Sequence, residues 1–332
     1  MIHELKVKDI GEFGLISRIE KMLGSSSEMV LVGLGDDTAT IKPHMQPLVI
    51  TTDTMVEDVH FRRDWSSPED VAHKALASNL SDLAAKCACP AFYLVTIGLP
   101  VDTPVRWVEE LYQRLVQLNQ EWKVELVGGD TIRSDKILIS ITACGYQTTT
   151  DPVRTRNARV GDRILVSGTL GDAAAGLDLL PKMRETELSQ DHLTFLLKRF
   201  NQPTPRNRES AAIARILEPH AMTDISDGLA REIPKICAAA GVGARVDASK
   251  LPCSEALRAF AGEQAVRYAW KGGEDYELLL TVSEEHAEVL LSQWDTSLCP
   301  LTEIGVVTEQ TDGVRVDGFN GSLEPGFDHY RE

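Results

Sequence analysis

The alternation of apolar and polar positions predicts helices mixed with strands in the N-terminal half of the chain. Apolar residues recur with helical spacing in three segments, over residues 12–23, 68–83 and 104–123. Short apolar runs bounded by polar or glycine-rich turns predict strands at 29–32, 47–50, 92–99, 124–127 and 137–145. We expect the strand at 137–145 to pair with the strand at 124–127.

The C-terminal half repeats this mixture. Helices are predicted at 191–200, 205–217, 229–240, 254–260 and 284–294, with another that begins after the glycine-rich turn at 168–176. Strands are predicted at 163–167, 244–247, 276–282, 304–307 and 314–316, and a further strand ends within 221–228. A polar stretch punctuated by Pro and Gly at 148–161 indicates a boundary between two domains, 1–150 and 151–332. We therefore expect an α+β fold of two α/β domains.

Acidic residues recur where the predicted strands end. Asp36 and Asp37 follow the first strand, Thr51, Thr52 and Asp53 follow the second, and G-G-D-T (128–131) and D-I-S-D-G (224–228) follow two others. Burial of a carboxylate is costly unless a cation or hydrogen bonds compensate it. Oxygen ligands without Cys or His suit Mg²⁺ or another hard cation. The simpler interpretation is a set of Asx turns, and a solvent-facing turn for the polar residues Asn79, Ser81 and Asp82.

Composition narrows the possible partners. The chain has 332 residues and a formal net charge of −16, which argues against a nucleic-acid surface or an anionic membrane as partner. Small phosphorylated ligands remain possible if bound cations reverse the local charge. The six cysteines show no C-x-x-C spacing, the N-terminus has no signal-peptide core, and no apolar run approaches the ~20 residues that span a bilayer. We expect a cytoplasmic protein with reduced thiols.

The motifs also carry a resemblance. In chain order they are G-E-F-G-L-I, G-D-D, T-T-D-T-M-V-E-D-V-H-F, N-L-S-D-L-A-A, G-G-D-T, D-I-S-D-G, G-G-E-D-Y-E and G-F-D-H-Y. This series, which spans residues 11–330, resembles the thiamine-monophosphate kinases, members of a superfamily similar to aminoimidazole ribonucleotide synthetase. The resemblance implies a two-domain fold, with an N-terminal domain for metal and ATP binding that pairs across a homodimer and a C-terminal α/β domain.

The resemblance implies roles for individual residues. The implied ligands of several Mg²⁺ ions are Asp37, Thr51, Thr52, Asp53, Asp82, Asp130, Asp224 and Asp227. The implied ATP contacts are Gly129, Asp130, Arg156 and Ser226. The implied contacts to thiamine monophosphate are His60, Glu274 and Phe327. One departure is visible, because Glu57 and Asp58 precede Val59-His60 where many relatives carry Gly.

The implied activity is ATP- and Mg²⁺-dependent phosphorylation of thiamine monophosphate to thiamine diphosphate by direct in-line transfer, the last step of thiamine diphosphate biosynthesis. No residue is assigned as a general base or nucleophile. Two alternatives remain open at this point. One is another ATP-dependent synthetase of the same superfamily, and the other is a non-catalytic scaffold that binds nucleotide and metal.

Overall fold

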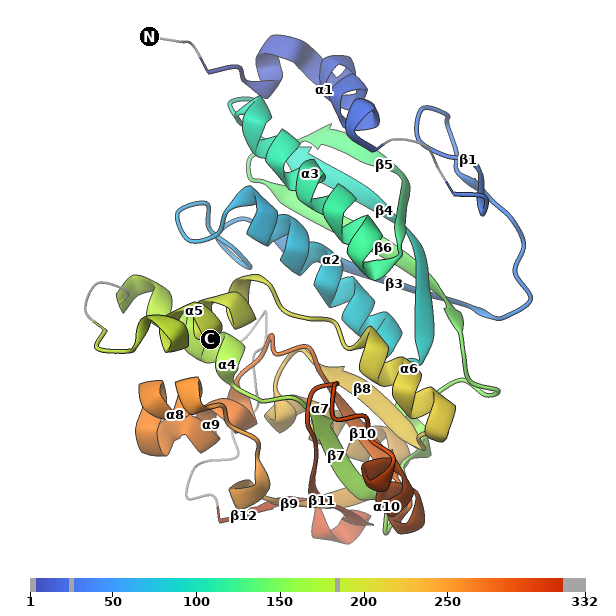
Figure 1. The fold of residues 1–332 in the computed structure, drawn as a ribbon, viewed down its shortest axis with the longest axis vertical. Helices are drawn as coiled ribbons and strands as arrows, with labels where there is room; N and C mark the ends of the chain where they lie inside the picture. Colours follow the sequence, from blue (N-terminus) through green and yellow to red (C-terminus); the bar gives the residue numbers. More distant parts are fainter. Residues whose placement is uncertain (1–3, 24–26, 183–185, 319–332) are drawn as a thin grey trace. The chain divides into compact units, whose positions relative to one another are not determined.

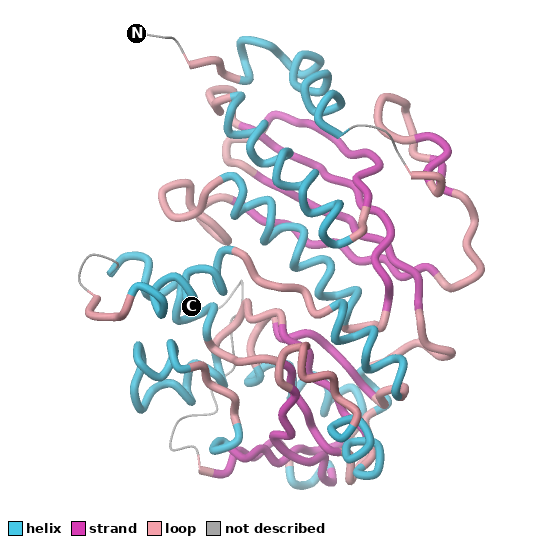
Figure 2. Tube along the Cα trace, viewed as in Figure 1, coloured by secondary structure: helices cyan, strands magenta, loops and turns pink. Residues whose placement is uncertain are grey.

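The computed structural model describes residues 4–23, 27–182 and 186–318 (Figure 1). The chain separates into two compact units. The N-terminal unit comprises Met1–Leu83 and Cys89–Tyr146, and the C-terminal unit comprises Ala84–Ala88 and Gln147–Glu332. Each unit combines helices with a sheet of its own (Figure 2), so the α+β fold expected from the sequence is confirmed.

The N-terminal unit is built on a four-stranded sheet in the order β3-β6-β4-β5. Its strands are β3 (Leu48–Val56), β4 (Ala88–Leu99), β5 (Glu125–Arg133) and β6 (Leu138–Gln147). A separate two-stranded sheet pairs β1 (Val30–Val32) with β2 (Thr40–Ile41). The helices are α1 (Val7–Leu23), α2 (Pro68–Ala84) and α3 (Val105–Trp122).

The two faces of the four-stranded sheet differ in burial. Alternate residues of β4, namely Tyr93, Val95 and Ile97, are buried, and α2 and α3 cover this face (Figure 1). The residues that alternate with these point to the other face of the sheet. That face carries exposed apolar residues from three strands: Leu48, Ile50, Leu94 and Ile132. We call the face under α2 and α3 the helix-covered face and the opposite face the open face.

Two sequence predictions about this sheet are wrong. Strand β5 pairs in parallel with β4, and β6 pairs antiparallel with β3, so the segments at 124–127 and 137–145 are not partners. Both β3 and β5 are also longer than predicted. Asp53 and Asp130 therefore lie inside paired strands rather than after their ends, because Thr, Gly and Asp extend the ladder once neighbouring strands accept their backbone groups.

The C-terminal unit has a six-stranded sheet in the order β12-β9-β11-β7-β10-β8. Its strands are β7 (Arg163–Ser167), β8 (Ala221–Ile225), β9 (Val242–Asp247), β10 (Glu277–Val282), β11 (Leu301–Glu309) and β12 (Val314–Asp317). Among the described strands of this six-stranded sheet, only β12 and β9 pair in parallel.

Seven α-helices of the described chain belong to this unit. They are α4 (Asp172–Leu179), α5 (Gln190–Asn201), α6 (Asn207–Ile216), α7 (Leu229–Ala240), α8 (Glu255–Ala261), α9 (Ala265–Lys271) and α10 (Glu284–Ser292). Short 3₁₀ helices occur at Thr155–Asn157, Leu180–Lys182, Ala248–Lys250, Gly262–Gln264 and Gln310–Asp312. The sequence patterns did not predict α9 or β2, because both are too short to show a period.

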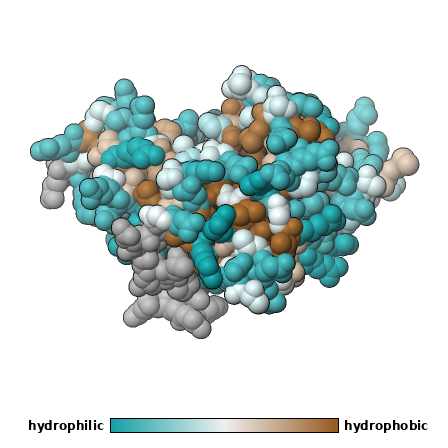
Figure 3. All heavy atoms as spheres, turned by 90° about the horizontal axis from the view of Figure 1, so that it is seen from below, coloured by the Kyte–Doolittle hydropathy of each residue, from teal (hydrophilic) through white to brown (hydrophobic). Residues whose placement is uncertain are grey.

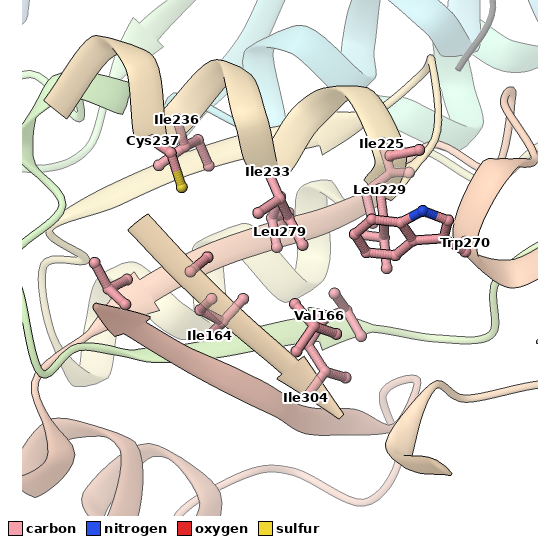
Figure 4. Packing of buried hydrophobic residues seen from close by; sticks show 14 of the residues in the cluster. Ile164, Val166, Ile225, Leu229, Ile233, Ile236, Cys237, Trp270, Leu279 and Ile304 are labelled. Atoms are coloured by element: carbon pink, nitrogen blue, oxygen red, sulfur yellow. The ribbon is translucent and has the colours of Figure 1, made fainter. Parts of the chain in front are cut away.

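The main core of the C-terminal unit lies between α7 and the sheet (Figure 4). Ile233 and Ile236 of α7 point toward Leu279 of β10 and the neighbouring strands, and Trp270 of α9 packs beside Leu229. Burial of such side chains contributes roughly 1.5–3 kcal/mol each. This core fixes β8 and the start of β10, the two segments that carry the acidic motifs of this unit.

Hydrophilic residues cover most of the face seen in Figure 3, and hydrophobic residues appear there in smaller patches. In the part of the chain that the structure describes, none of the helices combines the length and apolar character needed to cross a membrane.

Candidate active site

Strand β3 and helix α2 bring together three of the predicted metal ligands. The Thr51 hydroxyl donates to the Asp82 carboxylate at 2.5 Å. Asp53 follows two residues later, on the same side of the strand as Thr51. The polar residues of α2 do not form a solvent-facing turn, because Asn79 and Ser81 are fully buried. The Asn79 side chain accepts a hydrogen bond from the Asp53 backbone N–H at 3.0 Å and so ties α2 to β3.

Gly129 and Asp130 lie in the exposed part of β5. A Cβ atom added at Gly129 would collide with the backbone carbonyl of Val95 on the neighbouring strand. Glycine is therefore required here by the close approach of β4. Asp130 pairs in register with Thr96, and this places its side chain on the open face.

Asp53 and Asp130 are consequently far apart within one chain. They lie on β3 and β5, the two edge strands of the four-stranded sheet, and point toward opposite faces. Three strand spacings separate β3 from β5, or roughly 14 Å. Thr52 also lies on the open face, where its hydroxyl is 3.1 Å from that of Thr142. The structure therefore gathers Thr51, Asp53 and Asp82, but not Asp130.

Asp37 and His60 are carried by loops. Asp37 is exposed in the turn between β1 and β2, and its backbone N–H donates to the Asp36 carboxylate at 2.7 Å. His60 is partly buried, and its Nδ1 accepts from the Val56 backbone N–H at 3.1 Å. Asp58 adopts a positive φ of 67° in this loop, a conformation that glycine adopts without strain. A glycine would therefore suit this position without strain.

The D-I-S-D-G motif lies at the end of β8. Asp224 is buried within the strand, and Ser226 and Asp227 follow it in a partly buried turn before α7. The Asp227 carboxylate is 3.5 Å from the Arg231 guanidinium. Arg156 is exposed in the short helix Thr155–Asn157. Phe327 lies outside the described residues.

The G-G-E-D-Y-E loop is fastened to the D-I-S-D-G motif through its backbone. The Glu274 N–H donates to the Ser226 carbonyl at 2.7 Å, and the Tyr276 N–H donates to the Ile225 carbonyl at 2.9 Å. Glu274 and Tyr276 both have positive φ, 63° and 52°. Such conformations persist in non-glycine residues only where the surroundings impose them.

Asp275, between these two residues, is fully buried. Its carboxylate accepts from the backbone N–H groups of Gly171 at 2.5 Å and Ala173 at 3.2 Å, at the start of α4. Burial raises the pKa of Asp275 to about 7, against the opposing effect of Arg199. The glycine-rich turn at 168–176 therefore directs two of its amides to an internal carboxylate.

Sequence reasoning missed the role of Asp275 and of its charged neighbours. Glu277 accepts from the Ser167 hydroxyl at 2.6 Å, from Arg199 at 2.9 Å and from Arg206 at 2.6 Å. The acidic string in G-G-E-D-Y-E was a visible signal. The arginines gave none, because they lie more than 70 residues from Glu277 in the sequence and occupy ordinary helical positions.

A pocket of about 1110 Å³ in the N-terminal unit is distinct from these residues. Its lining includes Glu20, His44, Lys123 and Tyr146, and none of the predicted site residues. His44 and Tyr146 stack there with ring centroids 3.9 Å apart. Nothing in its lining indicates a particular ligand.

The residues around Thr51 fit a hard cation by type. They offer one hydroxyl and two carboxylates, an oxygen-only donor set of the kind that Mg²⁺ prefers. Within the residues that the structure describes, however, no three His, Cys, Asp or Glu side chains form a group that could hold a metal ion. Further oxygen ligands would have to come from water, from a bound phosphate group or from another chain.

Comparison with known proteins agrees with this arrangement of motifs. Residues 35–147 match the family described as AIR synthase related protein, N-terminal domain, and residues 159–318 match AIR synthase related protein, C-terminal domain. A thiamine-monophosphate kinase from Salmonella typhimurium is 38% identical, with coverage of 96% of this chain and 98% of that relative. The chain belongs to the thiamine-monophosphate kinase family.

Other members of the thiamine-monophosphate kinase family are similarly close. The Aquifex aeolicus protein is 37% identical over 98% of this chain and 100% of its own length. Among solved structures, the Stenotrophomonas maltophilia enzyme has a TM-score of 0.82 at 36% identity, covering 96% of this chain and 99% of that one. AaThiL complexed with AMPPCP and TMP has a TM-score of 0.76 at 36% identity, covering 99% and 100%. The E. coli hydrogenase maturation protein HypE, 20% identical with a TM-score of 0.76, shares the fold.

Proposed function

We propose that this chain transfers the terminal phosphoryl group of ATP to thiamine monophosphate and so forms thiamine diphosphate, the last step in the biosynthesis of that cofactor. The observation that carries the proposal is the AaThiL structure complexed with AMPPCP and TMP, which aligns with 99% of this chain. We assign the ATP contacts to Gly129, Asp130, Arg156 and Ser226 on the resemblance to the family. On the same ground we assign the contacts to thiamine monophosphate to His60, Glu274 and Phe327.

Magnesium is part of the proposal. Thr51, Asp53 and Asp82 would hold ions beside β3, and Asp37, Thr52, Asp130, Asp224 and Asp227 complete the proposed ligand set. Bound magnesium neutralises phosphate charge and holds the reacting groups in line. The clustered carboxylates of this acidic chain support the proposal, since without cations they would repel the phosphates of both substrates.

The acceptor explains why no general base is assigned. A phosphate monoester has its second pKa near 6, so its attacking oxygen is already largely deprotonated at neutral pH. Free thiamine offers a hydroxyl group, which would need a positioned base. The protein's task is then to orient two anionic groups. We therefore infer direct transfer without a phosphorylated enzyme intermediate.

We also propose a homodimer formed through the four-stranded sheet. The open face carries the exposed apolar side chains of Leu48, Ile50, Leu94 and Ile132, and such patches are typical of interfaces. If two sheets close edge to edge, the β3 edge of one copy lies beside the β5 edge of the other. Asp53 of one copy and Asp130 of the other, which one chain separates by three strand spacings, would then lie on neighbouring strands. A cytoplasmic location completes the proposal and agrees with six free cysteines.

The proposal is tested with the purified chain, ATP, MgCl₂ and either thiamine monophosphate or free thiamine. We expect thiamine diphosphate and ADP from the first acceptor and no phosphorylation of the second. Asp53→Ala should lower kcat/KM by about 100-fold or more, because charge neutralisation dominates phosphoryl transfer. Asp135→Ala, an exposed aspartate in the β5–β6 turn, is the matched control and should retain activity.

Absence of thiamine diphosphate formation by the wild-type chain would refute the proposed reaction. If Asp53→Ala turns over as fast as the wild type, the metal assignment is refuted but the proposed reaction is not. A radioactive phosphoryl group retained on the denatured protein after incubation with γ-labelled ATP would refute direct transfer.

A further inference from the structure

The C-terminal unit buries a cluster of charged side chains beside the G-G-E-D-Y-E loop. Asp172, Asp275 and Glu277 are each 0% exposed, and Arg199 and Arg206 lie against them. Removing charges from water is costly, and apolar residues of similar volume usually stabilise a protein as well or better. Stability alone therefore does not explain why five charged side chains are buried together. Their burial suggests that they fix a particular conformation of the chain.

Glu277 is held from several directions. Arg199 donates to it at 2.9 Å, Arg206 donates through two nitrogens at 2.5 and 2.6 Å, and the Ser167 hydroxyl donates at 2.6 Å. The carboxylate also lies directly against the Cα of Gly168, where a Cβ atom would collide with it. These contacts leave the Glu277 side chain no alternative orientation.

Asp275 fastens the same loop to α4 through the two backbone N–H groups of Gly171 and Ala173. Arg199 joins the two attachment points, because one of its nitrogens donates to the carbonyls of Thr169 at 3.2 Å and Asp275 at 3.3 Å. Ser254 and Thr169 donate to Asp172, which neighbours Arg199 at 3.8 Å. Asp275 and Arg199 therefore connect the loop at 271–277 to the turn at 168–172, and Arg206 holds Glu277 at the end of that loop.

The consequence for Glu274 is geometric. The buried Asp275 is flanked by two residues with positive φ, Glu274 and Tyr276. This conformation keeps Glu274 partly exposed while its backbone N–H remains bonded to Ser226. Without the buried anchors, the strained residues would relax toward ordinary φ values.

We propose that Asp275 and Glu277, held by Arg199 and Arg206, are positioning residues that fix Glu274 for contact with thiamine monophosphate. The assignment of the ligand rests on the proposed function, whereas the anchoring of the loop does not. Neither Asp275 nor Glu277 touches substrate in this scheme. Their effect passes through the backbone of residues 274–276.

The experiment compares Asp275→Ala and Asp275→Asn with Asp162→Asn in the full-length protein. Asp162 is a matched control, because it is also buried in the C-terminal unit but pairs with His220 at 2.9 Å, among residues outside the loop. Hydrogen exchange of the Glu274 and Tyr276 amides is measured without substrates. Melting temperature, and KM for thiamine monophosphate and for ATP, are then measured on the same samples.

We expect Asp275→Ala to speed exchange at both amides at least 10-fold and to raise KM for thiamine monophosphate by more than it raises KM for ATP. Asp275→Asn should restore part of both effects, because one side-chain oxygen still accepts from Gly171. Asp162→Asn should lower the melting temperature without changing amide exchange at Glu274 and Tyr276 or the KM for thiamine monophosphate. If Asp275→Ala is insoluble, Glu277→Gln serves in its place with the same expectations.

Unchanged exchange at Glu274 and Tyr276 would overturn the proposal, whatever the activity of the enzyme. Equal increases in both KM values, or the same pattern in Asp162→Asn, would also overturn it, because either result describes a general loss of structure. If the wild-type chain fails to phosphorylate thiamine monophosphate, the proposed function fails, and the exchange measurements still decide whether the buried charges position the loop.

Discussion

Glu274 and Asp275 are adjacent acidic residues with opposite environments. Glu274 is partly exposed, whereas Asp275 is buried near Arg199 and Asp172 and accepts from the backbone N–H groups of Gly171 and Ala173. In the proposed scheme, Glu274 contacts the ligand and Asp275 holds the chain. In an acidic motif, the number of carboxylates therefore says little about how many of them contact substrate.

The raised pKa of Asp275 predicts a pH dependence of stability. Its folded-state pKa is about 7, against a reference value of 3.8, so the folded state binds the proton more tightly than the unfolded state. The stabilising contribution is complete below about pH 4 and is lost as the pH rises toward 7. Asp275→Asn stays neutral throughout. The free energy of unfolding of the wild type should therefore fall relative to that of the variant over this interval.

Urea unfolding at pH 4.5, 5.5, 6.5 and 7.5 measures the free energy of unfolding of both proteins. The pKa shift of Asp275 limits the change in their difference to roughly 4 kcal/mol. Above pH 7 the difference should be constant. Parallel stability curves for the two proteins would show that Asp275 titrates normally in the fold.

At the residue level, sequence alone identified side chains that have local signals. Thr51 and Asp53 were grouped by type and Asp82 was added by family resemblance, and the structure places Thr51 within hydrogen-bond distance of Asp82. The sequence could not identify Arg199 or Arg206 as partners of Glu277, because no local pattern connects residues that are 71 or 78 positions apart. The proposed roles of Arg156, Ser226 and Phe327 remain predictions from family resemblance.

At the scale of elements, helices were predicted better than strand pairing. The strong amphipathic pattern of 104–123 corresponds to α3, whose buried residues Val108, Leu111 and Leu115 share one face. The lengths of β3 and β5 were underestimated, since the Asp of β3 and the Gly-Gly-Asp of β5 have low strand propensity and are held by tertiary pairing. Periodicity also carries no information about which strands are neighbours.

The β4–β5 pair offers a test with two adjacent glycines. In Gly129→Ala, the new methyl group would collide with the backbone of Val95, which cannot move without breaking the ladder. In Gly128→Ala, it would meet only the end of the flexible Leu94 side chain, at 3.1 Å. We expect Gly129→Ala to destabilise the protein by about 1–3 kcal/mol and Gly128→Ala to cost less. Chemical denaturation of both variants checks the order, and the reverse ranking would contradict the β4–β5 register.

For the whole molecule, the open face of the N-terminal sheet predicts self-association. Ile50 is 60% exposed in the centre of β3, a costly position for an isoleucine that faces water. Sedimentation equilibrium should give a mass about twice that of one chain. Ile50→Asp should shift the population toward monomer, because the interface would have to bury an unpaired charge.

Leu291→Asp, at a surface position of α10 with 39% exposure, is the control and should leave the mass unchanged. A wild-type chain that sediments as a monomer at micromolar concentration would contradict the proposed homodimer. Sequence resemblance suggested this association, but the pattern of residues alone could not show that one face of the sheet has no covering helix among the described elements.

The placement of Asp53 and Asp130 on opposite edges of one sheet also predicts how two defective alleles of the gene behave in the same cell. If the edge-to-edge contact of the proposed homodimer completes the site, each site takes Asp53 from one polypeptide and Asp130 from the other. Two alleles, one lacking Asp53 and one lacking Asp130, would each be inactive alone. In a cell that expresses both, a mixed pair would contain one site with both aspartates and one with neither. Such alleles would complement each other, and growth without added thiamine diphosphate would return although no gene copy is intact.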